Sequence, residues 1–292
     1  MIIATDNVLT LRDGRRLGCA EYGDPDGAPV FYFHGFPGSR LEARLTADAG
    51  ERLGVRVVAP DRPGYGLSDF QPGRRIPDWA DDVAELADAL GLARFSAVGV
   101  SGGGPYLMAC AARIPDRLAG EGLVCPLGPW VGPGASGRMR RLHRFARLMC
   151  HTVPWLLGVP GGAAAYMMRR HGEFVVSRVA GRLAPPDRTL LTRSTVREAL
   201  AASFREAMRK GSRAARCELG LYSRAWGVRP EDVRVPVRLW QGEQDVVIPP
   251  AMARHLAERI PDCRAVYFAD EGHFSLPLNR TEGILAAVKP PA

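Results

Sequence analysis

Residues 95–103, Phe-Ser-Ala-Val-Gly-Val-Ser-Gly-Gly, decide the fold, because they join a buried strand to a helix through a turn of small residues. Phe95 to Val100 is a mostly apolar run of strand length, and Gly102 to Ile114 has the spacing of a helix. Ser101 stands on the turn between them, where strained backbone angles require small neighbours. The stretch therefore predicts a strand–turn–helix unit with a serine side chain at its bend.

Strand-like and helix-like segments alternate on both sides of this unit. The expected strands are short and mostly apolar, at Arg16 to Tyr22, Val30 to Phe33, Val55 to Ala59, Leu118 to Cys125, Val235 to Trp240 and Ala265 to Phe268. The expected helices lie at Leu41 to Leu53, Pro77 to Leu90, Pro249 to Ile260 and Thr281 to Val288. This alternation predicts an α/β protein with a mostly parallel, twisted sheet flanked by helices.

The composition changes between residues 129 and 229. This segment is mostly helix-like, is punctuated by Gly and Pro clusters, and carries 19 basic but only 5 acidic residues. The rest of the chain carries 20 basic and 26 acidic residues, so the net charge of +8 comes from the middle segment. We expect a core domain of residues 1–128 and 230–292, with residues 129–229 inserted as a helical unit after about the sixth strand.

The overall composition excludes several classes of protein. With 46% hydrophobic and 24% charged residues among 292, the chain is typical of a globular protein and not of a disordered one. No run approaches the roughly 20 apolar residues of a transmembrane helix, and Met1 to Thr10 lacks a secretory signal, so we expect a cytoplasmic protein. The basic segment shows no RNA-binding pattern, so a nucleic-acid partner is not expected. The six cysteines form no C-x-x-C pair, which favours free thiols over a metal site.

A serine hydroxyl becomes an effective nucleophile only when a neighbouring base takes its proton. Of the six histidines, His273 is the best placed, because its loop follows the last expected strand and opens at the same sheet edge as Ser101. The base in turn needs a carboxylate that holds its tautomer. Asp245, in the loop after the preceding expected strand, is favoured for that role over three nearby carboxylates. These rivals are Glu243, Asp270 and Glu271.

The chain resembles the α/β-hydrolase family at five places. These are His34-Gly35-Phe36-Pro37-Gly38, Asp61-Arg62-Pro63-Gly64-Tyr65-Gly66-Leu67-Ser68, Gly99-Val100-Ser101-Gly102-Gly103, Gly242-Glu243-Gln244-Asp245 and Gly272-His273. The order serine, aspartate, histidine along the chain is also that of the family. Residues 129–229 correspond by position to the family's variable helical cap.

The resemblance implies a role for each matching residue. Ser101 would be the nucleophile, His273 the general base and then acid, and Asp245 the carboxylate that orients the imidazole. The backbone N–H groups of Phe36 and Gly102 would form the oxyanion hole. No metal or organic cofactor is implied.

The same resemblance places the substrate pocket under the cap. Phe36 and His34, in the loop after an expected strand, are candidate substrate contacts. Further candidates are aromatic or flexible cap side chains that suit an apolar pocket, although for any single one a place in the cap's own core is favoured: Trp130, Phe145, Met149, Trp155 and Tyr166. The positive charge of the cap fits an anionic or carrier-bound small-molecule substrate. The simpler interpretation, that the arginines solvate the cap helices, is favoured.

These expectations converge on a serine hydrolase that cleaves a small to medium carboxylic ester, thioester or lactone through an acyl-enzyme on Ser101. A serine at this position argues against the epoxide hydrolases and haloalkane dehalogenases of the fold, which carry aspartate there. Three alternatives stay open: a tailoring enzyme with non-hydrolytic or C–C-bond-cleaving chemistry, a peptidase similar to proline iminopeptidases, and a ligand-binding member without catalysis. The fold alone does not decide among them.

Overall fold

The computed structural model describes residues 1–129 and 158–290. Its strands are β1 (Ile2–Thr10), β2 (Arg16–Gly23), β3 (Ala28–Phe33), β4 (Val55–Pro60), β5 (Phe95–Val100), β6 (Leu118–Val124), β7 (Val237–Gly242) and β8 (Cys263–Phe268). They form one sheet in the order β1-β2-β4-β3-β5-β6-β7-β8. The pairs β1–β2 and β2–β4 are antiparallel and all other neighbours are parallel. The prediction of a mostly parallel sheet is thereby confirmed.

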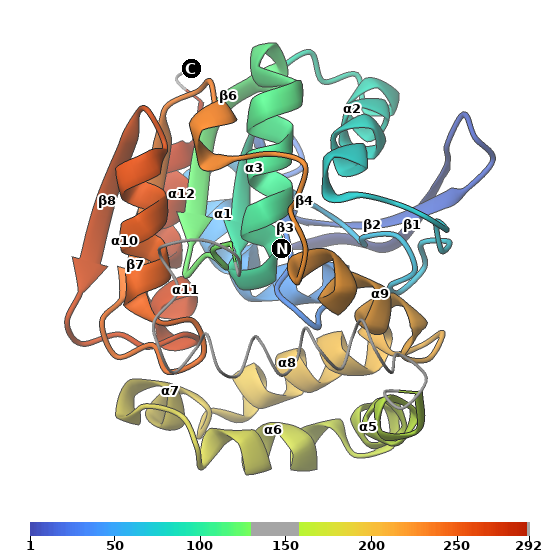
Figure 1. The fold of residues 1–292 in the computed structure, drawn as a ribbon, viewed down its shortest axis with the longest axis vertical. Helices are drawn as coiled ribbons and strands as arrows, with labels where there is room; N and C mark the ends of the chain where they lie inside the picture. Colours follow the sequence, from blue (N-terminus) through green and yellow to red (C-terminus); the bar gives the residue numbers. More distant parts are fainter. Residues whose placement is uncertain (130–157, 291–292) are drawn as a thin grey trace.

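Helices cover both faces of the sheet (Figure 1). They are α1 (Ala47–Leu53), α2 (Trp79–Ala89), α3 (Gly104–Arg113), α10 (Pro250–Arg259), α11 (Ser275–Asn279) and α12 (Thr281–Val288). Short 3₁₀ turns join them: η1 (Arg40–Thr46), η2 (Ile76–Asp78), η3 (Ser101–Gly103), η4 (Pro115–Arg117) and η5 (Pro230–Asp232). In Figure 1, α2, α3 and α10 lie in front of the sheet, and α1 and α12 lie behind it.

Each face of the sheet packs a separate apolar core. On one face, Phe31 of β3 lies in a buried cluster with Trp79 of α2. On the other face, Val57 of β4 lies in a second cluster with Ile284 of α12. Because the inner strands are buried on both faces, they are continuous apolar runs in the sequence and do not alternate between apolar and polar residues.

Helices α5 (Gly158–Arg170), α6 (Gly172–Ala180), α7 (Pro185–Leu190), α8 (Ser194–Ala207) and α9 (Arg213–Tyr222) follow β6 and precede β7. In Figure 1, α5 to α8 lie together beneath the sheet edge toward which β6 and β8 point. Val176, Leu190 and Leu200 belong to an apolar cluster that joins α6, α7 and α8. The helices thus enter after the sixth strand, as expected, while the division of the chain into two domains stays a prediction.

One buried arginine ties these helices to the sheet. Arg40 is 2% exposed, and its guanidinium reaches Asp61 at 2.8 Å and Glu206 of α8 at 2.7 Å. Asp61 also accepts the backbone N–H groups of Arg40 at 2.7 Å and of Leu67 at 3.0 Å. The carboxylate of Asp61 therefore fixes the turn that follows β4.

Parts of the fold differ from the sequence expectation. β1 was not expected, because its side chains are mostly exposed or half-buried and give no apolar pattern. The expected helix from Leu41 to Leu53 is the 3₁₀ turn η1 followed by α1. Helix α11, with only five residues, is too short to show helical spacing. Among the described residues, no helix is both long enough and apolar enough to cross a bilayer.

Candidate active site

Ser101 stands at the bend between β5 and α3 with a φ of 53°. This left-handed conformation is unfavourable for a residue with a side chain, and the close approach of strand and helix imposes it. A Cβ at Gly103 would lie 2.2 Å from the carbonyl oxygen of Phe33, and one at Gly99 would lie 2.9 Å from that of Gly103. The small neighbours of Ser101 are therefore a packing requirement at this bend.

A chain of hydrogen bonds joins the three residues predicted for catalysis. Oγ of Ser101 lies 3.0 Å from Nε2 of His273, and Nδ1 of His273 lies 2.7 Å from Oδ2 of Asp245. The three residues follow β5, β8 and β7, and loops after parallel strands open at one edge of a sheet. Both distances lie within the range over which a proton passes between side chains.

Asp245 is fixed by its own hydrogen bonds. Its Oδ1 accepts the backbone N–H groups of Val247 and Ile248, each at 2.8 Å. Its Oδ2 accepts the side-chain amide of Gln241 at 3.1 Å. Gln241 lies inside β7, and no sequence motif singles it out. The three rival carboxylates pair elsewhere: Glu243 with Arg254, Asp270 with Arg280, and Glu271 with Arg280 and Asn279.

The surroundings of His273 favour its protonated form. Burial alone would lower the pKa of the imidazole. The charge and hydrogen bond of Asp245, helped by the charges of Asp187 and Glu42, outweigh burial and raise the pKa above its ordinary value. An imidazolium formed by proton transfer from Ser101 would therefore be stabilised where it forms.

Two backbone segments meet beside Ser101. A Cβ at Gly102 would lie 2.7 Å from Cβ of Phe36 and 3.3 Å from its backbone nitrogen. The N–H of Gly102 lies in the first turn after the bend, where helical N–H groups have no partner within the helix. The N–H of Phe36 donates to no residue in the described part of the chain. Tyr222 of α9 donates to the Gly102 carbonyl at 2.8 Å and packs its ring edge-on against Phe36, which fixes both segments.

A cavity of about 80 Å³ opens at Ser101 and His273. The described side chains around it are mostly apolar and include Phe36, Leu45, Leu200, Phe204, Phe274 and Leu278. Tyr32 and Glu42 add a hydroxyl and a carboxyl group. The cavity therefore suits a small group that is apolar over most of its surface.

Glu42, on η1, is a site residue that the sequence analysis missed. Its Oε1 accepts the hydroxyl of Tyr32 and the backbone N–H of Gly35, each at 3.0 Å. Burial raises the pKa of this carboxyl, while the two hydrogen bonds act in the opposite direction. Glu42 thus supports the loop of residues 34–38 from inside the cavity. No sequence motif identifies Glu42 as a site residue, because the surrounding residues have the pattern of an ordinary helix.

Asp187 of α7 holds the loop of His273. Its carboxylate is fully buried and accepts three backbone N–H groups. Oδ2 accepts from His273 at 2.9 Å, and Oδ1 accepts from Phe274 at 2.9 Å and from Ser275 at 2.8 Å. A Cβ at Gly272 would lie 2.5 Å from this carboxylate. A helix between β6 and β7 therefore fixes the backbone of the proposed base, and no sequence motif predicts this contact.

Glu218 of α9 is buried beneath the loop of residues 34–38. Its carboxylate accepts a hydrogen bond from Nε of Arg62 at 2.7 Å and another from the hydroxyl of Tyr106 at 2.6 Å. Arg62 in turn donates to the carbonyl of Gly35 at 3.0 Å. Although burial alone would raise the pKa of Glu218, the charges of Arg62 and Arg74 lower it to about 2. The ionised pair therefore links α9 to the loop that carries Phe36.

The candidate substrate contacts are placed differently from one another. Phe36 lines the cavity, whereas His34 does not. The ring of His34 is fully buried, with Nδ1 2.9 Å from the carbonyl of Gly35 and Nε2 accepting the N–H of Arg62 at 3.3 Å, so it orders the loop. Tyr166 on α5 is 55% exposed and does not line the cavity. Trp130, Phe145, Met149 and Trp155 lie outside the described residues.

One group of side chains has the spacing of a metal site. Among the described residues, Cys125, Asp245 and His273 bring ligand atoms within 4.8 Å of one another. Burial raises the pKa of the Cys125 thiol well above its ordinary value, and a metal needs the thiolate. Asp245 and His273 already hydrogen-bond each other, so this group does not fit a metal centre.

Comparisons with known proteins point to one family. A family model described as alpha/beta hydrolase fold matches residues 28–279. A non-heme chloroperoxidase of Streptomyces lividans is 36% identical over 131 residues, which are 41% of this chain and 45% of that protein. Epoxide hydrolase B of Mycobacterium tuberculosis is 35% identical over 129 residues, which are 42% of this chain and 36% of that protein. The chain thus matches less than half the length of these curated relatives.

The solved structures agree with the family model. A thermophilic esterase from Thermogutta terrifontis, described with malate bound, matches with a TM-score of 0.66 and 26% identity. The match covers 97% of this chain and 95% of that one. Because the family model spans most of the chain and the described fold has the same architecture, the chain belongs to the α/β-hydrolase fold family.

Proposed function

We propose that the chain is a serine hydrolase that cleaves short-chain carboxylic esters, thioesters or lactones. The observation that carries this proposal is the hydrogen-bonded chain from Ser101 through His273 to Asp245, at 3.0 and 2.7 Å. A serine at the bend separates the chain from enzymes of the fold that use an aspartate there. The likeness to a thermophilic esterase over nearly the whole chain supports the ester class.

In the proposed reaction, Oγ of Ser101 attacks the substrate carbonyl carbon while His273 takes the serine proton. Asp245 holds the imidazole in the required tautomer and stabilises the imidazolium. The N–H groups of Phe36 and Gly102 stabilise the oxyanion, each contributing about 3 kcal/mol. His273 then protonates the leaving alcohol and activates the water that releases the acid.

The size of the cavity supports a preference for short acyl groups. The part of the cavity bounded by described residues has a volume of about 80 Å³, which suits a small acyl group better than a drug-sized ligand of several hundred Å³. Leu200 and Phe204 of α8 line this space, so the helices between β6 and β7 would limit the acyl length. We propose, on the same ground, that residues 129–229 act as the cap of this site.

Labelling with a fluorophosphonate, run beside hydrolysis of p-nitrophenyl esters of increasing acyl length, tests the proposal. Ser101→Ala should lose labelling and turnover, with kcat reduced on the order of 10⁶-fold if the nucleophile is lost. Ser177→Ala, an exposed serine on α6, is the matched control and should behave as the wild type. Folded wild-type protein that neither labels nor turns over any ester would refute the assignment. Labelling without ester turnover would instead favour a tailoring enzyme.

A further inference from the structure

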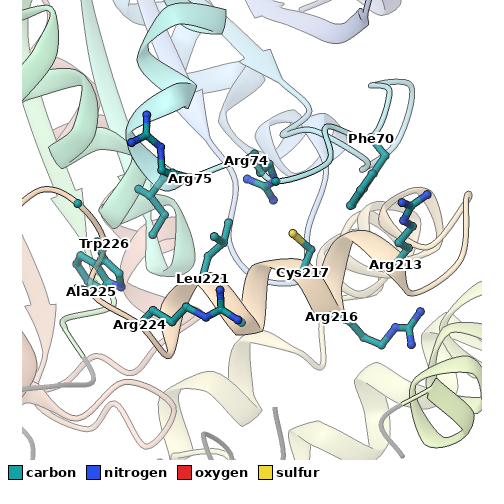
Figure 2. Close-up of a pocket in the computed structure, with 14 residues that line it drawn as sticks. Phe70, Arg74, Arg75, Arg213, Arg216, Cys217, Leu221, Arg224, Ala225 and Trp226 are labelled. Atoms are coloured by element: carbon teal, nitrogen blue, oxygen red, sulfur yellow. The ribbon is translucent and has the colours of Figure 1, made fainter. Parts of the chain in front are cut away.

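A second pocket, of about 520 Å³, lies between α9 and the segment of residues 70–76 (Figure 2). Five arginines contribute to its described lining, namely Arg74, Arg75, Arg213, Arg216 and Arg224. No aspartate or glutamate is among the described lining residues. None of these residues lines the cavity at Ser101, so the two spaces are distinct.

The chain itself compensates only part of the positive charge of this pocket, since Arg75 pairs with Asp78 at 3.0 Å and Arg74 lies 3.5 Å from Glu218. Arg216 and Arg224 are exposed, and their guanidinium groups form no ion pair or hydrogen bond with any described residue. Arg213 stacks on the ring of Phe70, with its guanidinium carbon 3.9 Å from the centroid, which leaves its charge unpaired. Residues 130–157 contain no aspartate or glutamate, so they offer no side-chain carboxylate either. The pocket therefore attracts anions.

Arg74 adds a buried donor without an acceptor. It is 4% exposed and donates from Nη1 to the hydroxyl of Tyr106 at 2.9 Å. Its Nε–H is buried and has no hydrogen-bond partner among the described residues. An unpaired buried donor costs free energy, so the hydrogen bonds within the described chain leave Arg74 incompletely satisfied.

The rest of the lining is apolar and leaves room for a carbon skeleton. Phe70, Ile76, Leu221 and Trp226 contribute side chains, and Figure 2 shows Leu221 and Cys217 pointing from α9 toward the opposite wall. The volume is several times what a bare inorganic anion fills and is within the range of small-molecule sites. The ligand that fits combines a concentrated negative charge with an apolar body.

We propose that this pocket binds a phosphate monoester that carries an aromatic or other apolar group. A phosphate monoester has a charge near −2 at neutral pH and three acceptor oxygens, which match the excess of guanidinium donors in the lining. A carboxylate, with one charge and two oxygens, meets fewer of these donors. The apolar group lies against Phe70, Leu221 and Trp226.

Isothermal titration with phenyl phosphate, inorganic phosphate and phenol tests the proposal at about 0.15 M salt, where weak surface attraction is screened. The proteins are the wild type, a double variant Arg216→Gln with Arg224→Gln, and Arg113→Gln. Arg113 is exposed on α3 and lies outside the pocket, so its variant removes one charge without touching the site. Because Arg216 and Arg224 are exposed, we expect the double variant to keep the fold, and an unchanged melting midpoint would verify this.

Phenyl phosphate should bind the wild type and Arg113→Gln equally, and at least about tenfold more tightly than either inorganic phosphate or phenol. The double variant should lose about tenfold or more in affinity, as expected for two charge-assisted hydrogen bonds. Equal affinity in the double variant, or an equal loss in Arg113→Gln, would overturn the proposal. So would the absence of phenyl phosphate binding at millimolar concentration.

A second arm separates this pocket from the site at Ser101. Protein whose cavity at Ser101 is filled, either the wild type carrying the fluorophosphonate adduct or the bulky variant Leu200→Trp, should bind phenyl phosphate with an unchanged Kd. Loss of binding in the protein with the filled cavity would place the phosphate at Ser101 and overturn the proposal. Because the readout is binding, the result stands even if the proposed hydrolase activity fails.

Discussion

Asp187→Asn tests whether a helix between β6 and β7 positions the proposed catalytic base. The wild-type carboxylate accepts N–H groups from His273, Phe274 and Ser275 at 2.8 to 2.9 Å. An asparagine keeps the shape but offers one oxygen, so at least one buried N–H loses its acceptor. The cost of one such group is about 1–3 kcal/mol. We expect the loop of His273 to shift and the rate of Ser101 labelling to fall by about 10- to 100-fold.

The pH profile of kcat/KM shows whether Asp187→Asn acts by misplacing His273 or by a general loss of stability. His273 acts as a base only when neutral, and its raised pKa places the acid limb of kcat/KM above the ordinary histidine value of about 6.5. The charge of Asp187 contributes to that rise, so Asp187→Asn should move the limb to lower pH while lowering the plateau. A purely structural role would lower the plateau and leave the midpoint in place.

Asp270→Asn is the matched control, because Asp270 lies in the same loop but is 74% exposed and pairs with Arg280. It should keep both the plateau and the midpoint of the wild type. The reasoning fails if Asp187→Asn retains the wild-type labelling rate and midpoint, or if Asp270→Asn reproduces its effects.

Three further predictions concern buried carboxyl groups. Glu218→Gln leaves Arg62 and Arg74 buried without a counter-charge, so urea unfolding should show a loss of about 3–5 kcal/mol, whereas the exposed Glu198→Gln should show almost none. Glu42→Gln keeps an acceptor for Gly35 and Tyr32 and should retain Ser101 labelling within a few-fold, but Glu42→Ala should lower it about tenfold or more. The carboxyl group of Glu121 is buried without a hydrogen-bond partner among the described residues, and burial raises its pKa well above the ordinary value. It therefore stays protonated in the folded protein at pH values at which the unfolded chain has released this proton. Its presence therefore lowers stability as pH rises above about 4.3, and Glu121→Gln should flatten that dependence by up to about 1.4 kcal/mol per pH unit, with the exposed Glu258→Gln as control.

The strands of the inner sheet were predictable because burial on both faces leaves a strong apolar signal. Phe95 to Val100 is observed with the predicted bounds, and so is the closing helix from Thr281 to Val288. β1 was not predicted from the sequence. An edge strand with exposed side chains needs only backbone pairing, which leaves no apolar pattern. The helix expected from Leu41 begins as a 3₁₀ turn, in which the charged side chains of Arg40 and Glu42 are buried against the sheet.

The residues of the candidate site also differ in whether the local sequence predicts them. Ser101, Asp245 and His273 stand at strand ends, where local sequence context and chain order mark them. Gln241, Glu42 and Asp187 touch the same site but act through tertiary contacts. The N–H groups that Asp187 accepts lie 86 to 88 positions away along the chain. No local pattern encodes a partner at that separation, so a single sequence gives no means to find it.

The charge imbalance of residues 129–229 has a structural explanation in where its few acids lie. Of the five acidic residues there, Asp187 and Glu218 are fully buried, one under the loop of His273 and the other under the loop of Phe36. Glu206 pairs with the buried Arg40. Three of the five acidic residues are thus used for positioning, and few remain to neutralise the arginines at the surface. The same arrangement that links these helices to the proposed catalytic loops therefore leaves the pocket along α9 positively charged.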